Sequence, residues 1–258
     1  MAHSSHISIG FFFLLWREIH RFLRLANQTL VPPLLTVVLY ILIFGYSLGS
    51  RISSVGNVSY MHFIIPGLVM MSVITSAYAN TSTSLYLARF QRNIDELLVS
   101  PLSNLQIVGA IVLGGVLRGL CVGILVAGTA TLMSGIPLRN PAVTLYFVVL
   151  VALVFSCAGF ISALWADDFD RLSFGQTYIL TPLTYLGGVF FSIDMLPGIW
   201  RHVAAVNPIL YFVNGLRFGF LGISDVNVVL SATAVLALGA ALFYVCYALF
   251  KSGYNIKT

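Results

Sequence analysis

AVTLYFVVLVALVFSCAGFISALW, residues 142–165, contains no Asp, Glu, Lys or Arg and is longer than the ~20 apolar residues that a helix needs to cross a bilayer. The whole chain is 59% hydrophobic and 8% charged, with a mean hydropathy of +0.97. Long continuous apolar runs are typical of membrane helices, whereas the strands of a membrane barrel alternate apolar and polar residues. The sequence therefore predicts an all-α polytopic membrane protein.

Six apolar runs are predicted to span the membrane, and they leave no separate soluble domain within residues 1–258. Their approximate bounds are 29–49, 63–88, 105–134, 142–165, 173–193 and 227–250. With a cytoplasmic N-terminus, eight basic residues lie inside and four outside: Arg17, Arg21, Arg24, Arg89, Arg92, Arg171, Lys251 and Lys257 against Arg51, Arg139, Arg201 and Arg217. The positive-inside rule favours this orientation, which puts both termini in the cytoplasm.

The first 27 residues are predicted to form an amphipathic helix that rests on membrane lipids at the interface. Apolar and cationic residues recur there at helical spacing, with Ile9, Phe13, Trp16 and Leu23 near one face and Arg17, Arg21, Arg24 and Gln28 on another. The alternative is a frayed, solvated tail, and the large rings of Phe13 and Trp16 argue against it.

A charged segment, RFQRNIDELLVSPLS at residues 89–103, interrupts the apolar sequence between the second and third spans. We predict one short amphipathic helix over residues 89–101 at the cytoplasmic surface, ended by Pro101. Ser103 and Gln106 then have the form of a capping box that begins the third span. The helix has an apolar and a charged side: Phe90, Ile94, Leu97 and Leu98, against Arg89, Arg92, Asp95 and Glu96.

The mixed charge of this segment favours a protein partner over an anionic lipid surface, which would select Lys and Arg alone. Its apolar side is free either to anchor against the chain's own helices or to enter a groove on that partner. The alternative is a solvated loop helix held only by an Arg92–Glu96 pair, which would contribute ~0.2–0.5 kcal/mol.

Residues 194–222 are apolar but interrupted, because Pro197 and Pro208 break the run and Arg201, His202 and Arg217 lie within it. A seventh span would bury these cations in lipid, which is costly. Two short helices that dip into the outer leaflet as a re-entrant hairpin fit the sequence better.

The chain lacks the residues that several classes of protein need for their function. On this map all eight Asp and Glu fall at span ends or in loops, so the mid-membrane coupling site of an ion-driven carrier is missing. No catalytic or metal-binding motif occurs, and no phosphate-binding loop precedes either lysine. The dispersed basic residues do not suggest nucleic acid binding. We therefore expect no cofactor in this chain, and any ATP-driven transport requires a separate ATPase.

The second span contains SAYANTSTS, residues 76–84, whose small polar side chains require partners away from lipid. We predict that Asn80 and Thr83, together with Tyr185 beside the proline kink at Thr181–Pro182, line the central path or the dimer seam. The alternatives are helix packing for the polar run and a static kink for the proline.

Arg118 lies in the third span among glycines that recur every four residues and allow close helix approach. We expect a structural role for it, with its guanidinium bonded to the carbonyl of a neighbouring helix or loop. The alternatives are a functional charge near the middle of the bilayer, or a side chain that snorkels to the headgroups from a span that begins deep in the cytoplasm.

The C-terminal half resembles the signature of the type-2 ABC transporter permeases, at that family's spacing. The matching positions are Leu180, Leu183, Leu186, Gly187 and Val189, followed by Leu196–Pro197, Pro208–Ile209, Tyr211 and Arg217. The stretches FIIPGLVMMSVITSAYAN and LTPLTYLGGVF are similar to the YadH-type branch of bacterial permeases, and the likeness runs over nearly the full length.

The resemblance implies a half-transporter of the bacterial inner membrane, in which two copies of the chain form the translocation path. Two copies of a separate ATPase, which would hold ATP and Mg, are then expected to bind from the cytoplasm. The coupling helix of the family corresponds to residues 89–101, and its outer hairpin to 194–222. Relatives of this kind are exporters, but the resemblance fixes neither the cargo nor whether the two permease copies are identical. A non-transporting scaffold or sensor and an ion-coupled carrier are the competing functions.

Overall fold

The computed structural model describes residues 2–48, 54–55 and 58–256, with side chains from residue 9 onward apart from 45–48. Arg51 and Lys257, which enter the charge count, and the predicted end of the first span at residue 49 lie outside these residues. The described chain is mostly helical, as its composition predicts, with one short pair of strands.

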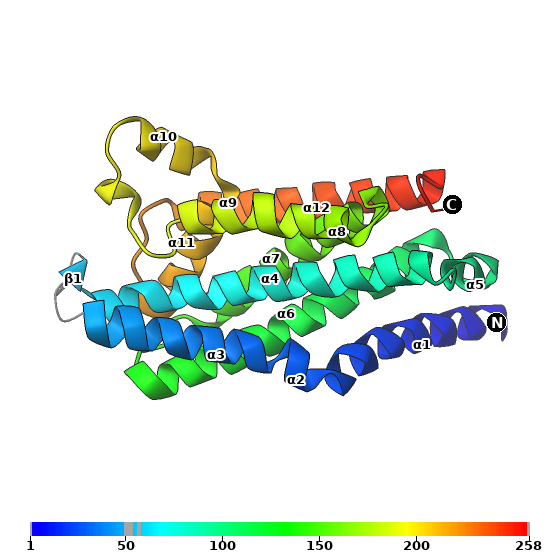
Figure 1. Cartoon of the computed structure of the whole chain (residues 1–258), viewed down its shortest axis with the longest axis horizontal. Helices are drawn as coiled ribbons and strands as arrows, with labels where there is room; N and C mark the ends of the chain where they lie inside the picture. Colours follow the sequence, from blue (N-terminus) through cyan, green and yellow to red (C-terminus); the bar gives the residue numbers. More distant parts are fainter. Residues whose placement is uncertain (1, 49–53, 56–57, 257–258) are drawn as a thin grey trace.

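The elements run in the following order, with labels as in Figure 1: α1 (Ala2–Arg24), α2 (Ala26–Thr29), α3 (Val31–Tyr40), η1 (Ile41–Leu48), β1 (Ser54–Val55), β2 (Val58–Ser59), α4 (Tyr60–Phe90), α5 (Ile94–Val99), α6 (Asn104–Ser134), α7 (Pro141–Trp165), α8 (Phe169–Phe174), η2 (Gly175–Leu180), α9 (Thr181–Leu186), η3 (Ile193–Met195), α10 (Ile199–Val206), α11 (Pro208–Leu221) and α12 (Val228–Ser252). η1 and η2 are π-helical stretches, and η3 is a 3₁₀ turn. β1 and β2 pair antiparallel.

α4 is the central helix of the bundle, between α6 and α7. In its most apolar stretch 78% of the residues are buried. The value is 17% for the corresponding stretches of Ala26–Phe44 and Val228–Ser252, which therefore lie at the periphery. The approach is close at Gly115 of α6, where an added methyl would lie 2.2 Å from Thr81 Oγ1 and 2.4 Å from Ser156 Oγ. The close packing predicted from the glycine spacing of the third span is confirmed.

Five helical segments are long and apolar enough to span a membrane: Ala26–Phe44, Tyr60–Phe90, Asn104–Ser134, Pro141–Trp165 and Val228–Ser252. They correspond to five of the six predicted spans. The prediction of a helix over 173–193 is wrong at its end, because the helical path of α8, η2 and α9 stops at Leu186. The chain turns there through Gly188, whose φ of +75° lies in the left-handed region that favours glycine.

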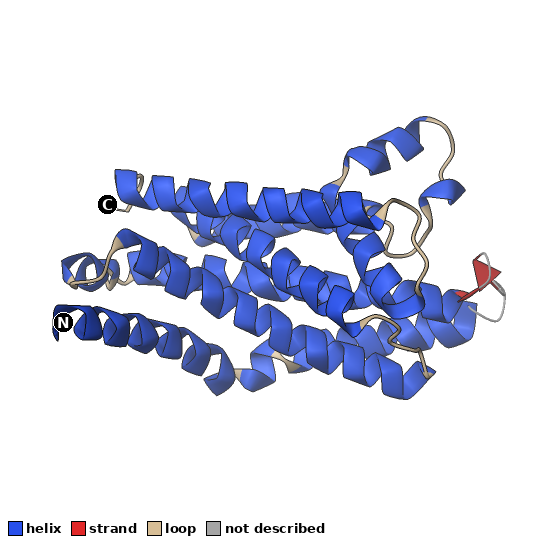
Figure 2. Cartoon of the chain, turned by 180° about the vertical axis from the view of Figure 1, so that it is seen from behind, coloured by secondary structure: helices blue, strands red, loops and turns tan. Residues whose placement is uncertain are grey.

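Both termini and α5 lie at one end of the bundle, whereas the β1–β2 pair and α10 lie at the other (Figures 1 and 2). The predicted capping box at the start of α6 is confirmed. Ser103 Oγ accepts from the Gln106 backbone N–H at 3.3 Å, and the Ser103 N–H donates to Gln106 Oε1 at 2.9 Å.

The N-terminal helix α1 ends at Arg24, three residues before the predicted end, because Leu25 leaves the helical conformation. It packs lengthwise beside α6 (Figure 1) and buries Leu14, Glu18 and Phe22, which recur every four residues. The predicted apolar face is the exposed one: Ile9, Phe13, Trp16 and Leu23. An exposed apolar face is suited to lipid contact, and its position at the membrane interface stays a prediction.

The predicted hairpin contains the two expected short helices, α10 and α11, joined at Asn207. They differ in burial: α10 projects from the bundle in Figure 1, whereas α11 packs against α4, α7 and α12. Arg217 of α11 is completely buried. Its expected place on an outer loop is therefore corrected to an internal one, and the depth of the hairpin in the outer leaflet stays a prediction.

Candidate functional site

The charged segment after α4 is divided into two helices, so the prediction of one continuous helix over 89–101 is wrong. α4 continues through Arg89 and Phe90, and a turn over 91–93 separates it from α5. Arg92 occupies the left-handed region in this turn, with φ of +61°, and its N–H donates to the Arg89 carbonyl at 2.9 Å. A left-handed residue just after the last turn is a common way to end a helix.

The turn changes which side chains of the segment are free. Ile94 and Leu97 face the chain's own core and are 2% and 8% exposed, and Leu98 is half-buried. Of the two uses open to the predicted apolar side, the structure assigns these residues to anchoring on the chain itself. The side chains that remain exposed at the end of α4 and along α5 form what we call the α5 surface: Phe90, Arg92, Asp95, Glu96 and Val99.

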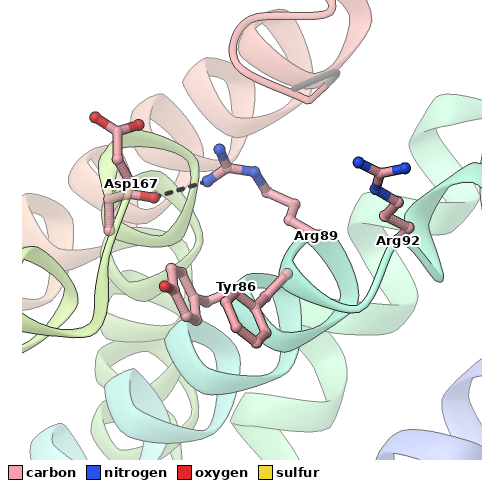
Figure 3. A pocket seen from close by; sticks show the side chains of 6 residues that line it. Tyr86, Arg89, Arg92 and Asp167 are labelled. Atoms are coloured by element: carbon pink, nitrogen blue, oxygen red, sulfur yellow. Dashed lines mark hydrogen bonds between the residues drawn. The ribbon is translucent and has the colours of Figure 1, made fainter.

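Arg89 points into the protein rather than outward. Its Nη1 donates to the Leu164 carbonyl at 3.2 Å and the Ala166 carbonyl at 3.1 Å, and also to the carbonyl of Ala163. These carbonyls end α7 and lack partners within the helix, and a cation there also complements the helix dipole. Arg89 therefore ties the end of α4 to the end of α7 (Figure 3).

The sequence ADDFDR, residues 166–171, forms the α7–α8 loop and the first turn of α8 and lies against this same segment. The Phe169 ring packs on Tyr86 and Phe90, with centroid distances of 4.7 Å and 5.7 Å. A shallow hollow between loop and helix end is lined by six residues, whose side chains are drawn in Figure 3: Tyr86, Arg89, Phe90, Arg92, Ala166 and Asp167. The end of α4 is therefore in contact with both the end of α7 and the start of α8.

Two residues at this end were missed by sequence reasoning. Val99 is 87% exposed on the α5 surface, but it did not fit the periodicity of one unbroken helix. Asn255, near the C-terminus, donates to the Leu164 carbonyl at 2.9 Å and to Asp167 Oδ1 at 3.2 Å. No local signal predicts Asn255, because its partners are 88 and 91 residues away in sequence.

The signature residues of the C-terminal half connect α9, α10 and α11. A methyl at Gly187 would lie 2.5 Å from Ile209, so α9 and α11 touch there. Arg217 donates to the Gly188 carbonyl at 2.7 Å and to Asp225 at 3.1 Å, and the Tyr211 hydroxyl donates to the Ala205 carbonyl at 2.9 Å. The two prolines begin turns and helices, Pro197 before α10 and Pro208 at the first position of α11.

Comparison with known proteins matches residues 10–221, which include α5 and the signature residues, to the family described as ABC-2 type transporter. The chain belongs to the ABC-2 type transporter family. It is 46% identical over 242 residues, 94% of each chain, to the inner membrane transport permease YadH of Escherichia coli (strain K12). It is also 27% identical over 248 residues, 93% of this chain and 89% of the relative, to nodulation protein J of Rhizobium meliloti (strain 1021).

In this ABC-2 permease the polar run of α4 faces protein, as predicted: Tyr78 bonds to Ser162 of α7, and Asn80 and Ser84 bond to α1. Asn80 is fully buried and accepts from Arg21 Nη2 through both its Oδ1 and its backbone carbonyl, each at 3.1 Å. Ser84 Oγ donates to the Glu18 carboxylate at 2.6 Å. This supports the packing alternative within one copy, and a pathway role for Asn80 and half-buried Thr83 stays a prediction.

Tyr185 is placed differently, since it is 42% exposed on the surface of the ABC-2 permease. Its hydroxyl lies 3.3 Å from the Tyr40 hydroxyl, and its ring stacks on Phe190 at a centroid distance of 5.9 Å. The pair joins α9 to α3 at the surface of the bundle, and the role of Tyr185 in the path or the dimer seam stays a prediction.

The expected carbonyl bond of Arg118 is wrong as far as the described residues show. The Arg118 side chain is partly buried on α6, and its Nε has no hydrogen-bond partner among them.

Proposed function

We propose that this permease is the membrane half of an ATP-driven exporter, in which two copies of the chain form the path. Two copies of a separate ATPase would bind ATP and Mg and dock on the α5 surface from the cytoplasm. The observation that carries the proposal is the link from this exposed surface through Arg89 to the end of α7. Force on α5 is thereby transmitted to α4 and α7, the two helices at the centre of the bundle.

The transmembrane domain is proposed to have six spans, with α8, η2 and α9 as the fifth. These elements have six residues each, and a continuous helical path of that length extends about 27 Å, close to the ~30 Å of a hydrocarbon core. The hairpin α10–α11 would then lie in the outer leaflet, and both termini and α5 in the cytoplasm of a bacterial cell.

The function is tested by purifying the tagged permease from its native membranes in mild detergent. We expect a copurifying polypeptide with a phosphate-binding loop, and ATP hydrolysis that a change of its loop lysine abolishes. Transport that persists after ATP depletion, from a permease that carries no such subunit, would favour the ion-coupled carrier instead.

The proposed orientation predicts which introduced cysteines react with an impermeant thiol reagent in intact cells. We expect Ser54→Cys and Leu138→Cys to be labelled from outside, and Asn93→Cys only after the membrane is opened, because Asn93 lies beside α5. The background is Cys121→Ser, since the other two cysteines are buried. Labelling of Asn93→Cys in intact cells would mean that the chain has the opposite orientation in the membrane.

The packing and pathway roles are separated by Asn80→Leu and Tyr185→Ala. The first change removes the Oδ1 that accepts from Arg21, and we expect lower unfolding temperature, with a cost of about 1–3 kcal/mol. Tyr185→Ala, at an exposed site, is expected to change transport at nearly unchanged stability. Loss of transport by Asn80→Leu at full stability would show that Asn80 lines the path.

A further inference from the structure

Four charged residues gather where α1 packs on α6: Arg17, Glu18, Arg21 and Arg118. Glu18 is 1% exposed, and its carboxylate lies 3.1 Å from Arg21 Nη2 and 3.4 Å from Arg17 Nη2. A methyl added at Gly114 of α6 would lie 2.6 Å from Glu18 Cβ, so the two helices touch there. α1 and α6 run in the same direction (Figure 1). Arg21 and Arg118 each follow this contact by about one turn, a spacing that places both on the sides of their helices that meet.

This cluster has more positive than negative charge, with three guanidinium groups and one carboxylate. The Nε atoms of Arg21 and Arg118 are both buried without a hydrogen-bond partner among the described residues. The chain has eight Asp and Glu in total, and the other seven lie in α5, in the α7–α8 loop, in the first turn of α8 or at the opposite end: Asp95, Glu96, Asp167, Asp168, Asp170, Asp194 and Asp225. Among the described residues Glu18 is the one carboxylate in the cluster, which leaves two of its three positive charges for an anion from outside the chain to balance.

The depth of the cluster corresponds to the edge of the hydrocarbon layer on the side of both termini. Ser84, the partner of Glu18, lies six residues before the end of α4, or about 9 Å along the helix. Helical side chains tilt toward the N-terminus of their helix, which directs Arg118 toward the same end of the bundle. A long cationic side chain at such a depth reaches for headgroups.

The surface beside the cluster is apolar and exposed. Phe13, one turn before Arg17 on α1, is 71% exposed, and Trp16 is 64% exposed. Tryptophan in particular concentrates at the boundary between headgroups and acyl chains. A ligand held here would thus contact guanidinium groups with one part and lipid-exposed rings with another.

We propose that Arg17, Arg21 and Arg118 bind the phosphate of an acidic phospholipid at the seam between α1 and α6. The fork of N–H donors on arginine matches phosphate oxygens, and an anionic headgroup offsets the excess positive charge. The bound lipid would hold α1 against the polar run of α4 through Arg21 and Asn80. Assignment to the inner leaflet rests on the orientation proposed above, whereas the site itself does not depend on an ATPase.

The test uses the purified full-length permease in nanodiscs of phosphatidylcholine, with or without phosphatidylglycerol. Native mass spectrometry counts the phosphatidylglycerol molecules retained, and thermal unfolding reports their effect on stability. We expect the wild-type permease to retain phosphatidylglycerol and to unfold at higher temperature with it. Arg118→Gln and Arg17→Gln should each bind it about fivefold more weakly, the order expected for one charge lost near an anionic membrane surface.

Arg24→Gln is the matched control, because Arg24 is exposed on the same helix and the change removes the same charge. It is expected to keep wild-type retention. Arg17 is half-exposed, so Arg17→Gln tests the site even if Arg118→Gln fails to fold. Arg118→Lys should retain part of the binding, since it keeps the charge but loses the fork.

Three results would overturn the assignment. Equal losses of phosphatidylglycerol binding in Arg24→Gln and Arg118→Gln would show diffuse electrostatic attraction of the lipid rather than a specific site. Stabilisation of the permease in phosphatidylcholine by inorganic phosphate, to the level that phosphatidylglycerol gives, would identify a soluble anion site instead. Wild-type retention of phosphatidylglycerol by both Arg118→Gln and Arg17→Gln would leave the cluster as an internal ion network only.

Discussion

Replacement of Val99 by glutamate is expected to abolish assembly of the permease with its ATPase while leaving the permease folded. Val99 is 87% exposed at the end of α5 on the proposed docking surface, so the change buries no charge within the chain itself. In the docked complex, however, a carboxylate would be desolvated without a partner. Loss of an anchor at an interface costs about 2 kcal/mol or more, so we expect affinity to fall at least about 30-fold, measured by copurification and by stimulated ATP hydrolysis.

The matched control is Val206→Glu, the same change at a residue that is 83% exposed on α10, at the opposite end of the bundle. It is expected to leave ATPase assembly at the wild-type level. If Val99→Glu also retains assembly and stimulated hydrolysis, the α5 surface is not where the ATPase docks, and the 166–171 loop becomes the next candidate.

Leu97→Ala is expected to act differently from Val99→Glu, because Leu97 is only 8% exposed and packs in the chain's own core. Truncation of a buried leucine costs about 2–5 kcal/mol. Any loss of ATPase assembly in Leu97→Ala should therefore accompany a lower unfolding temperature, whereas Val99→Glu should lose assembly alone.

Arg217→Met is expected to lower the free energy of unfolding more than any other single change in α11. Arg217 is fully buried, donates to Gly188 and Asp225, and lies 3.8 Å above the centroid of the Phe63 ring. Removing one partner of a buried pair leaves the other without compensation, at a cost of about 3–5 kcal/mol. Thermal unfolding of the permease in nanodiscs measures the effect.

Arg201→Met serves as the control for Arg217→Met, because Arg201 pairs with Asp194 at 2.8 Å but both side chains are more than half exposed. An exposed pair contributes only about 0.2–1 kcal/mol. A similar loss for both variants would mean that the Arg217 network contributes no more than a surface ion pair. We expect Arg217→Lys to fall between wild type and Arg217→Met, since it keeps a charge but loses the second donor group.

The sequence by itself determined the membrane class, the approximate position of the long helices and the capping box at Ser103. These features depend on composition and on contacts within one or two helical turns. Apolar length decides whether a helix can span a bilayer, and a cap is made by residues three positions apart. The polar run of α4 also predicted correctly that this helix faces protein, because lipid offers it no hydrogen-bond partner.

Only the tertiary structure decided which partners these residues have. Periodicity predicts one helix over 89–101, but packing turns Ile94 and Leu97 inward and a turn at Arg92 breaks the helix. Arg89 bonds residues 74–77 positions away, and Asn80 holds Arg21 across 59 positions. Such contacts form when whole helices pack, so their energy depends on the arrangement of the bundle, and no local pattern encodes which guanidinium meets which carbonyl.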